Sequence, residues 1–167
     1  MTTSWDDGRE FERGQVFFVN FNDEASNNNR PSRLLRGPHR VVVLFCSTFP
    51  RNTVAVVPIS SLYEADGVTL KDAISSDVIL KSKEYDESVS PYNGTIAKDS
   101  FIMTNQIRSV TRSRLERQVG EILPKDMIKL DIQLIETLSL SDTVQQMIET
   151  EVEKRLAEMG YVSEEAE

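Results

Sequence analysis

Short apolar runs rich in β-branched and aromatic residues alternate with polar segments from the N-terminal region to about residue 123. The runs at 15–21, 40–47 and 53–59 have the composition of strands. The second is apolar at nearly every position, as expected for a strand buried on both faces, and turn-forming residues join it to the third as a hairpin. Pro58 predicts that the third strand ends there or lies at an edge, because proline has no N–H for a strand ladder.

The following part of the chain consists of shorter candidate strands separated by loops. The candidate strands are 77–81, 101–104, 106–110 and 119–123, the predicted loops are 62–76 and 83–94, and 112–117 is a short turn or helix.

After Pro124 the apolar spacing becomes helical. Met127, Leu130, Leu134 and Leu138 recur at steps of three and four residues, and proline suits a first helical position. A second helix, capped by Ser139 or Ser141 and closed by Gly160, has one apolar face and one face of Gln and Glu. We expect its apolar face to pack on the domain or on a partner subunit. Strands followed by helices predict a mainly β fold, a small antiparallel barrel or sheet with helices at one end.

The composition adds limits on function. The chain has 167 residues and a net charge of −8, which argues against a protein that coats DNA with a basic surface. Residues 141–167 carry −6 of that charge, so the acidity belongs mostly to the C-terminal segment. The N-terminus does not have the pattern of a signal peptide, and no apolar run approaches the roughly 18 residues of a membrane span. We therefore expect a cytoplasmic protein without a membrane segment.

Most signatures of catalytic and metal sites are missing from the sequence. It contains no Gly-rich phosphate loop, no Gly-x-Ser-x-Gly motif and no His-Glu-x-x-His motif. The single cysteine allows neither an intramolecular disulfide nor a cysteine zinc site, and the single histidine excludes a pair of catalytic histidines. We expect neither a metal nor a cofactor.

A basic cluster without any acidic residue stands out in the long polar loop 22–37 and at the start of the second strand. Its members are Arg30, Arg33, Arg36, His39 and Arg40. One interpretation is a solvated surface loop. The other is a phosphodiester site, because guanidinium groups bind phosphate oxygens in pairs of hydrogen bonds.

Two serines at the end of the third strand extend this second interpretation, since a hairpin would bring Ser60 and Ser61 to the same end of the sheet. RNA cleavage by attack of the 2′-OH needs a base, a proton for the leaving oxygen and donors to the charged phosphorane. His39 is suited to proton transfer, arginine to charge stabilisation, and Ser60 to donation to an oxyanion.

At these residues the sequence resembles the MazF/PemK family of toxin endoribonucleases, over about residues 13 to 140. Four blocks carry the resemblance in the family's order: Gly14-Gln15-Val16-Phe17-Phe18; Gly37-Pro38-His39-Arg40 before an apolar strand; Val56-Val57-Pro58-Ile59-Ser60; and Asp99-Ser100 followed by Gln106-Ile107-Arg108 and Arg114-Leu115. The closing helix with Leu138-Ser139-Leu140 is similar too.

The resemblance implies a small SH3-like antiparallel β-barrel of the MazF/CcdB type, a homodimer, an antitoxin partner and metal-independent cleavage of single-stranded RNA. In such toxins an arginine before the second strand and a threonine after the third are catalytic. Their positions here are His39 and Ser60, while a slip of one residue brings Arg40 into the arginine's place, and the literal Arg-Pro is Arg30-Pro31. We accordingly predict His39, Arg40 and Ser60 as catalytic residues. The predicted RNA-binding residues are Arg30, Arg33, Arg36, Ser61 and Arg108.

The implied organisation is an N-terminal arm at 1–13, the barrel domain at 14–140, and an acidic amphipathic helical extension at 141–167. This extension exceeds the usual family length. One hypothesis is that its acidic helix lies across the basic loop and gates the access of RNA to that loop.

Two other functions stay open. One is a non-catalytic module of the same fold that binds nucleic acid or a protein target, as the related CcdB proteins do. The other is an unrelated barrel with a phosphorylated small-molecule ligand.

Overall fold

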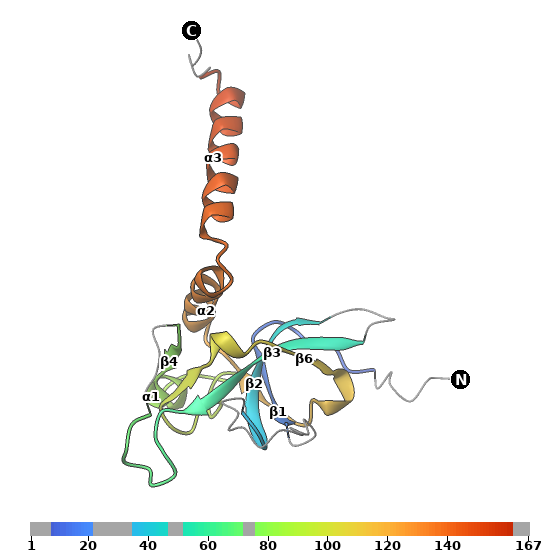
Figure 1. The fold of residues 1–167 in the computed structure, drawn as a ribbon, viewed down its shortest axis with the longest axis vertical. Coiled ribbons are helices and arrows are strands. Elements are labelled where there is room, and N and C mark those ends of the chain that lie inside the picture. The colour runs from blue at the N-terminus through green and yellow to red at the C-terminus, as the bar shows by residue number, and fades with distance from the viewer. Residues whose placement is uncertain (1–7, 22–34, 47–51, 72–75, 162–167) are drawn as a thin grey trace, which may run out of the picture.

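The described part of the protein is an antiparallel sheet, a short helix between two of its strands, and two longer helices after it (Figure 1). The computed structural model describes residues 8–21, 35–46, 52–71 and 76–161. Within this described part, the strands are β1 (Gln15–Asn20), β2 (Pro38–Cys46), β3 (Thr53–Ser61), β4 (Val78–Leu80), β5 (Ser100–Ile102), β6 (Arg108–Thr111) and β7 (Gln118–Glu121). They form one half-barrel in the order β4-β5-β3-β2-β1-β7, with β6 paired to β3.

The helices are α1 (Ser82–Asp86), α2 (Pro124–Thr137) and α3 (Ser141–Glu158), with 3₁₀ turns η1 (Thr104–Gln106) and η2 (Arg112–Arg114). The predicted mainly β fold with C-terminal helices is confirmed.

Strand β2 separates two hydrophobic clusters, one on each face of the sheet. Val42 packs in a cluster with α2 residues Leu130 and Leu134, whereas Val41 and Val43 pack in a second cluster with other strand residues. All three valines are fully buried. Alternating side chains of one strand point to opposite faces, so burial on both faces explains the nearly continuous apolar run.

Pro58 lies inside β3 rather than at its exit or at an edge, so that prediction is wrong. β3 pairs with β6 up to Val56 and with β5 from Ile59 onward, and Pro58 falls between these two partners. Its carbonyl accepts a hydrogen bond from Met103 N at 3.0 Å. Since the N and C=O of one strand residue point the same way, the missing N–H faces the break between β5 and β6, where no ladder bond is lost.

The predicted loop at 83–94 begins as helix α1. The carboxylate of Asp99 accepts hydrogen bonds from Ser82 N and Oγ at 2.9 and 3.0 Å, which satisfies an N–H at the start of this helix. The helix also carries Tyr85, which is fully buried. Its capping group comes from a distant part of the chain, so a local pattern does not predict it.

The prediction that residues 1–13 lie outside the core is wrong for Phe11. This side chain is only 8% exposed and belongs to the cluster that contains Val41 and Val43. The guanidinium of Arg9 holds the segment against the barrel by hydrogen bonds to the carbonyls of Leu115, Glu116 and Arg112.

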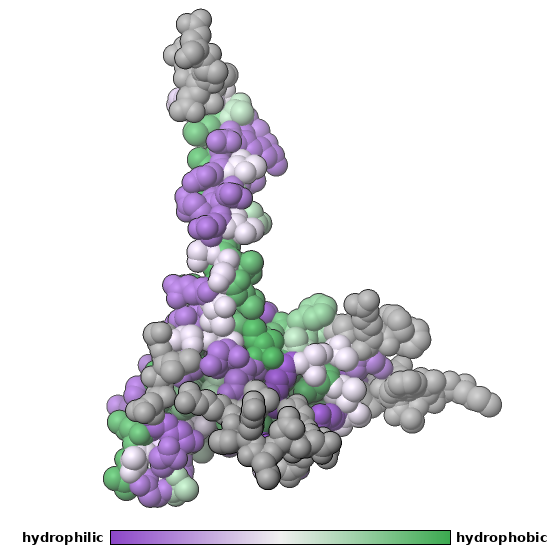
Figure 2. Space-filling model, in the orientation of Figure 1, coloured by the Kyte–Doolittle hydropathy of each residue, from purple (hydrophilic) through white to green (hydrophobic). Residues whose placement is uncertain are grey.

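Helix α3 projects away from the barrel, and none of its residues is buried (Figure 1). Apolar side chains gather over α2 and the beginning of α3, while much of α3 is hydrophilic (Figure 2). Its predicted packing on the domain is therefore not found, because the helix continues outward from the end of α2. Residues 22–34 of the basic loop lie outside the described residues, so a position of α3 across that loop stays a prediction. Neither Ser139 nor Ser141 caps it by a side-chain hydrogen bond; the N-cap is Leu140. Packing of α3 against a partner subunit stays a prediction.

Candidate active site

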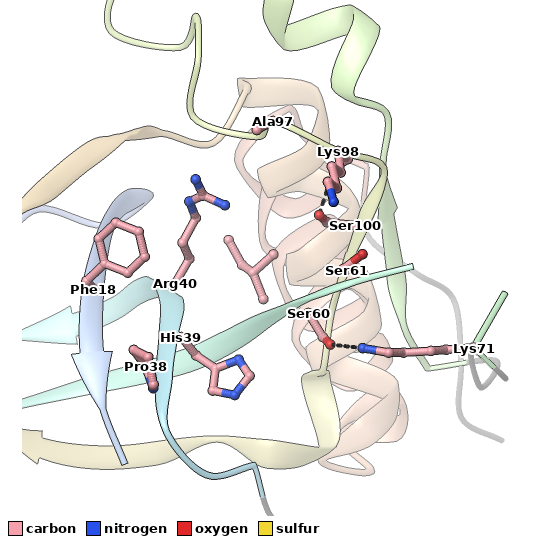
Figure 3. A pocket seen from close by; sticks show the side chains of 11 residues that line it. Phe18, Pro38, His39, Arg40, Ser60, Ser61, Lys71, Ala97, Lys98 and Ser100 are labelled. Atoms are coloured by element: carbon pink, nitrogen blue, oxygen red, sulfur yellow. Dashed lines mark hydrogen bonds between the residues drawn. The ribbon is translucent and has the colours of Figure 1, made fainter. Parts of the chain in front are cut away.

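A pocket of about 350 Å³ opens where β2 begins and β3 ends (Figure 3). Its lining contains three cationic side chains and a histidine but no carboxylate, although the protein as a whole is acidic. The lining residues are Phe18, Pro38, His39, Arg40, Ile59, Ser60, Ser61, Lys71, Ala97, Lys98 and Ser100. The lining is thus locally cationic.

Strand alternation divides this pocket into two sides. Arg40 pairs with Phe18 on β1 and with Ile59 on β3, and it lies on the face of the sheet that packs against α2. His39 precedes it and points to the other face, where its ring lies 6.4 Å from the ring of Phe21. Ser60 follows Ile59 and therefore shares the face of His39. Figure 3 shows Arg40 on one side of the strands, and His39 and Ser60 on the other.

The hydrogen bond of His39 fixes which ring nitrogen carries the proton. Its Nε2 lies 2.9 Å from the carbonyl oxygen of Arg36. A carbonyl only accepts, so Nε2 is the donor, and Nδ1 of the neutral ring is the nitrogen that can take up a proton. The backbone just before β2 thereby orients the ring of His39.

Ser60 is buried, with 6% of its surface exposed, and its hydroxyl is held by a lysine that the sequence analysis missed. Lys71 Nζ donates to Ser60 Oγ at 3.2 Å. An ammonium group has no acceptor, so the hydroxyl accepts here and keeps its own proton for donation. Lys71 reaches this position because its N–H bonds to Leu62 O at 2.8 Å, and Leu62 N in turn bonds to Asp99 O at 2.9 Å.

Arg40 occupies the other side without a counter-charge from the pocket lining. Its buried Nε has no hydrogen-bond partner among the described residues. Its guanidinium carbon lies 5.3 Å from the centre of the Phe18 ring, and that of Arg117 lies 6.0 Å from the same ring. Burial, and secondarily the charge of Arg117, lower the pKa of Arg40 from its ordinary value.

The structure thus brings together His39, Arg40, Ser60 and Ser61 of the predicted site residues. Arg36 contributes its carbonyl to His39. Arg108 does not line the pocket: its guanidinium carbon lies 4.5 Å from the Phe21 ring centre.

Arg30 and Arg33 lie outside the described residues. Lys71, Lys98 and Arg117 were missed by the sequence analysis. Only Lys98 carried a local signal, because it directly precedes the Asp99-Ser100 block.

The described residues show neither a cluster of metal ligands nor a membrane-spanning helix. No group of three or more His, Cys, Asp or Glu side chains is arranged to hold a metal ion there. The described helices are also too short or too polar to cross a bilayer.

Comparison with known proteins gives a family match over most of the chain. The model of the family described as "PemK-like, MazF-like toxin of type II toxin-antitoxin system" matches residues 12–138. No curated protein sequence matches.

Several solved structures resemble the protein at low sequence identity. An endoribonuclease in complex with its cognate antitoxin, from a mycobacterial species, is 17% identical, with a TM-score of 0.50 over 78% of this chain and 97% of that one. MazF from Deinococcus radiodurans is 16% identical, with a TM-score of 0.49 over 77% of this chain and 96% of that one. The Mycobacterium tuberculosis toxin MazF-mt6 is 13% identical, with a TM-score of 0.48 over 75% of this chain and 96% of that one. The first of these likenesses supports the half-barrel fold.

Proposed function

The chain belongs to the family of PemK-like, MazF-like toxins of type II toxin-antitoxin systems, and from this membership we propose that it is an endoribonuclease of single-stranded RNA. The reaction is attack of a 2′-OH on the neighbouring phosphodiester, without a metal ion. One observation carries this proposal: the pocket at the ends of β2 and β3 has a base, a hydroxyl donor and cations, and no carboxylate to repel a phosphate.

In the proposed reaction Nδ1 of His39 takes the proton of the 2′-OH as its oxygen bonds to phosphorus. The hydroxyl of Ser60 donates to a non-bridging oxygen, where negative charge increases in the phosphorane. The bond from phosphorus to the 5′-oxygen then breaks, and this oxygen takes a proton from solvent. The products are a 2′,3′-cyclic phosphate and a 5′-hydroxyl, and His39 returns its proton to solvent.

His39 is a better partner for Ser60 than Arg40 is. Both His39 and Ser60 lie on the same face of the sheet, whereas Arg40 lies on the opposite face. Lys71 is a positioning residue in this scheme, because its bond to Oγ turns the hydroxyl proton of Ser60 away from Nζ.

Partners follow from the same proposal. An antitoxin is expected because one structural relative was solved with its cognate antitoxin. We also propose a homodimer and a cytoplasmic location, where RNA and an antitoxin would meet the protein. Two exposed apolar residues of α3, Met147 and Ile148, support a surface for a second subunit.

The test is cleavage of a long single-stranded RNA in EDTA by the wild type and by His39→Gln. We expect discrete fragments with 2′,3′-cyclic phosphate ends from the wild type, and a rate lower by about 10²–10⁴-fold for the variant, the usual contribution of a general base. Lys83→Gln, an exposed lysine paired with Glu87, is the matched control and should cleave normally. Equal rates for wild type and His39→Gln would rule out His39 as the base.

The replacement of the family's arginine by His39 favours one second function, a module that binds RNA without cutting it. RNA that is bound but stays intact at high protein concentration, also after removal of residues 141–167, would establish that function instead.

A further inference from the structure

We propose that Arg40, together with Lys98 and Arg117, binds a second phosphate of the single-stranded RNA, adjacent along the strand to the phosphate cleaved at His39 and Ser60. This inference rests on the proposed function. It assigns Arg40 to binding rather than to the chemical step. The site lies on the face of β2 that is opposite to His39.

An anion completes the environment of Arg40. Its Nε is buried and has no partner among the described residues, and the pocket lining offers it no carboxylate. Arg117 brings a second guanidinium to the same Phe18 ring, and its positive charge acts on Arg40. Arg40 is half-buried, and polar atoms taken out of water, such as its Nε, are normally paired; a guanidinium binds phosphate oxygens with two parallel hydrogen bonds.

Lys98 adds a cation to the same side of the pocket. Figure 3 shows it with Ser100 and Ser61, on the Arg40 side of the strands. Ser100 Oγ donates to the carbonyl of Lys98 at 2.7 Å, which fixes the backbone from which the lysine extends. Arg40 of β2 and Lys98 of the segment before β5 line the pocket, and Arg117, from the segment before β7, lies at the Phe18 ring that borders it.

Two phosphates, rather than one, fit the division of the pocket. Arg40 and His39 are consecutive residues with Cα atoms about 3.8 Å apart, but their side chains leave β2 toward opposite faces. Side chains that leave a strand toward opposite faces present separate parts of the pocket to a ligand, so we assign one phosphate to each. An RNA strand that crosses the ends of β2 and β3 places one phosphate on each side.

The experiment measures binding of a 2′-O-methyl RNA oligonucleotide, which has no attacking hydroxyl and stays intact. Binding is recorded over a series of salt concentrations for wild type, Arg40→Gln, Arg40→Lys and Arg155→Gln. We expect Arg40→Gln to lower the slope of log K against log salt by about 0.7, the contribution of one phosphate contact on a single strand. Arg40→Lys should keep the slope with weaker binding, because it keeps the charge and loses the paired hydrogen bonds. Arg155 lies on α3, so its variant should match the wild type.

The kinetic counterpart uses cleavable RNA. Arg40→Gln should raise KM and leave kcat nearly unchanged, whereas His39→Gln should lower kcat. A slope and an affinity equal to those of the wild type, in an Arg40→Gln protein with an unchanged thermal midpoint, would overturn the inference. A wild-type protein that does not bind the oligonucleotide would overturn it as well. Failure of the wild type to cleave RNA is a separate result that refutes the proposed function, and a lowered slope would still support the phosphate site.

Discussion

The hydrogen bond between Lys71 and Ser60 predicts that the two side chains act as one unit in cleavage. Lys71 Nζ donates to Ser60 Oγ at 3.2 Å, and Ser60 is almost fully buried. If the lysine acts through the hydroxyl, its removal should slow cleavage only while the hydroxyl is present. Ser60→Ala, Lys71→Met and the double variant form the cycle that measures this dependence.

The expected magnitudes come from the two contacts. Ser60→Ala removes one donor to the phosphorane and should slow cleavage by about 10²–10³-fold. Lys71→Met removes a hydrogen bond from a charged donor, about 1.5–3 kcal/mol, which corresponds to roughly 10–100-fold in rate. Independent contributions would multiply to about 10³–10⁵-fold in the double variant. Contributions through one hydroxyl leave the double variant close to Ser60→Ala alone.

Single-turnover cleavage of RNA in EDTA is the assay, because it reports the chemical step. A second cycle, with Lys98→Met in place of Lys71→Met, is the control. Lys98 lies on the other side of the pocket from Ser60, so the decreases in rate caused by Lys98→Met and Ser60→Ala should multiply. Lys71→Arg and Ser60→Thr should each recover much of the rate, since they keep the donor and the hydroxyl. Losses for Lys71→Met and Ser60→Ala that multiply in full would refute the positioning role of Lys71.

Three further predictions concern stability. Tyr85→Phe removes the 3.1 Å hydrogen bond from the Tyr85 hydroxyl to the fully buried carboxylate of Asp126. We expect the free energy of unfolding, measured by urea denaturation, to fall by about 1–3 kcal/mol. An unchanged urea midpoint would contradict this. The hydrogen bond from Ser82 N is the largest cause that lowers the pKa of Asp99, and other donors including Lys81 add to it. The ionised Asp99 therefore stabilises the fold at pH values above its unfolded pKa of about 3.9. This stabilisation is lost as the pH falls through the lower pKa of the folded state. The urea midpoint of Asp99→Asn should therefore lie below that of the wild type at pH 7, with the difference shrinking below about pH 4; a difference independent of pH would show another cause. Deletion of 141–167 should shift the thermal midpoint by less than about 2 °C at a protein concentration where the protein is monomeric, because α3 buries no side chain within the single chain, and a larger loss there would show that the helix supports the barrel.

Much of the fold is determined by local sequence. The apolar runs of β1, β2 and β3 and the helical spacing of α2 are strong patterns because one or both faces of each element are buried. Strands followed by helices then leave few arrangements other than a small antiparallel barrel, and the family blocks agree with it. The sequence also places His39 at the start of one strand and Ser60 at the end of the next.

Other features depend on contacts between distant segments. Helix α1 begins where Asp99 supplies its hydrogen-bond acceptor, and Phe11 is buried because later segments cover it. Lys71 enters the pocket from a loop without a periodic pattern, so its sequence neighbourhood does not reveal the site.

The two sides of the pocket show most directly which feature the local sequence does not determine. Alternation alone places His39 and Arg40 on opposite faces of their strand, as the sequence already determines. Which of them shares a face with Ser60 depends on the register between β2 and β3, in which Arg40 lies opposite Ile59. A shift of one residue would exchange the faces. That register is set by the packing of both strands into the two hydrophobic clusters, and therefore only the tertiary structure decides it.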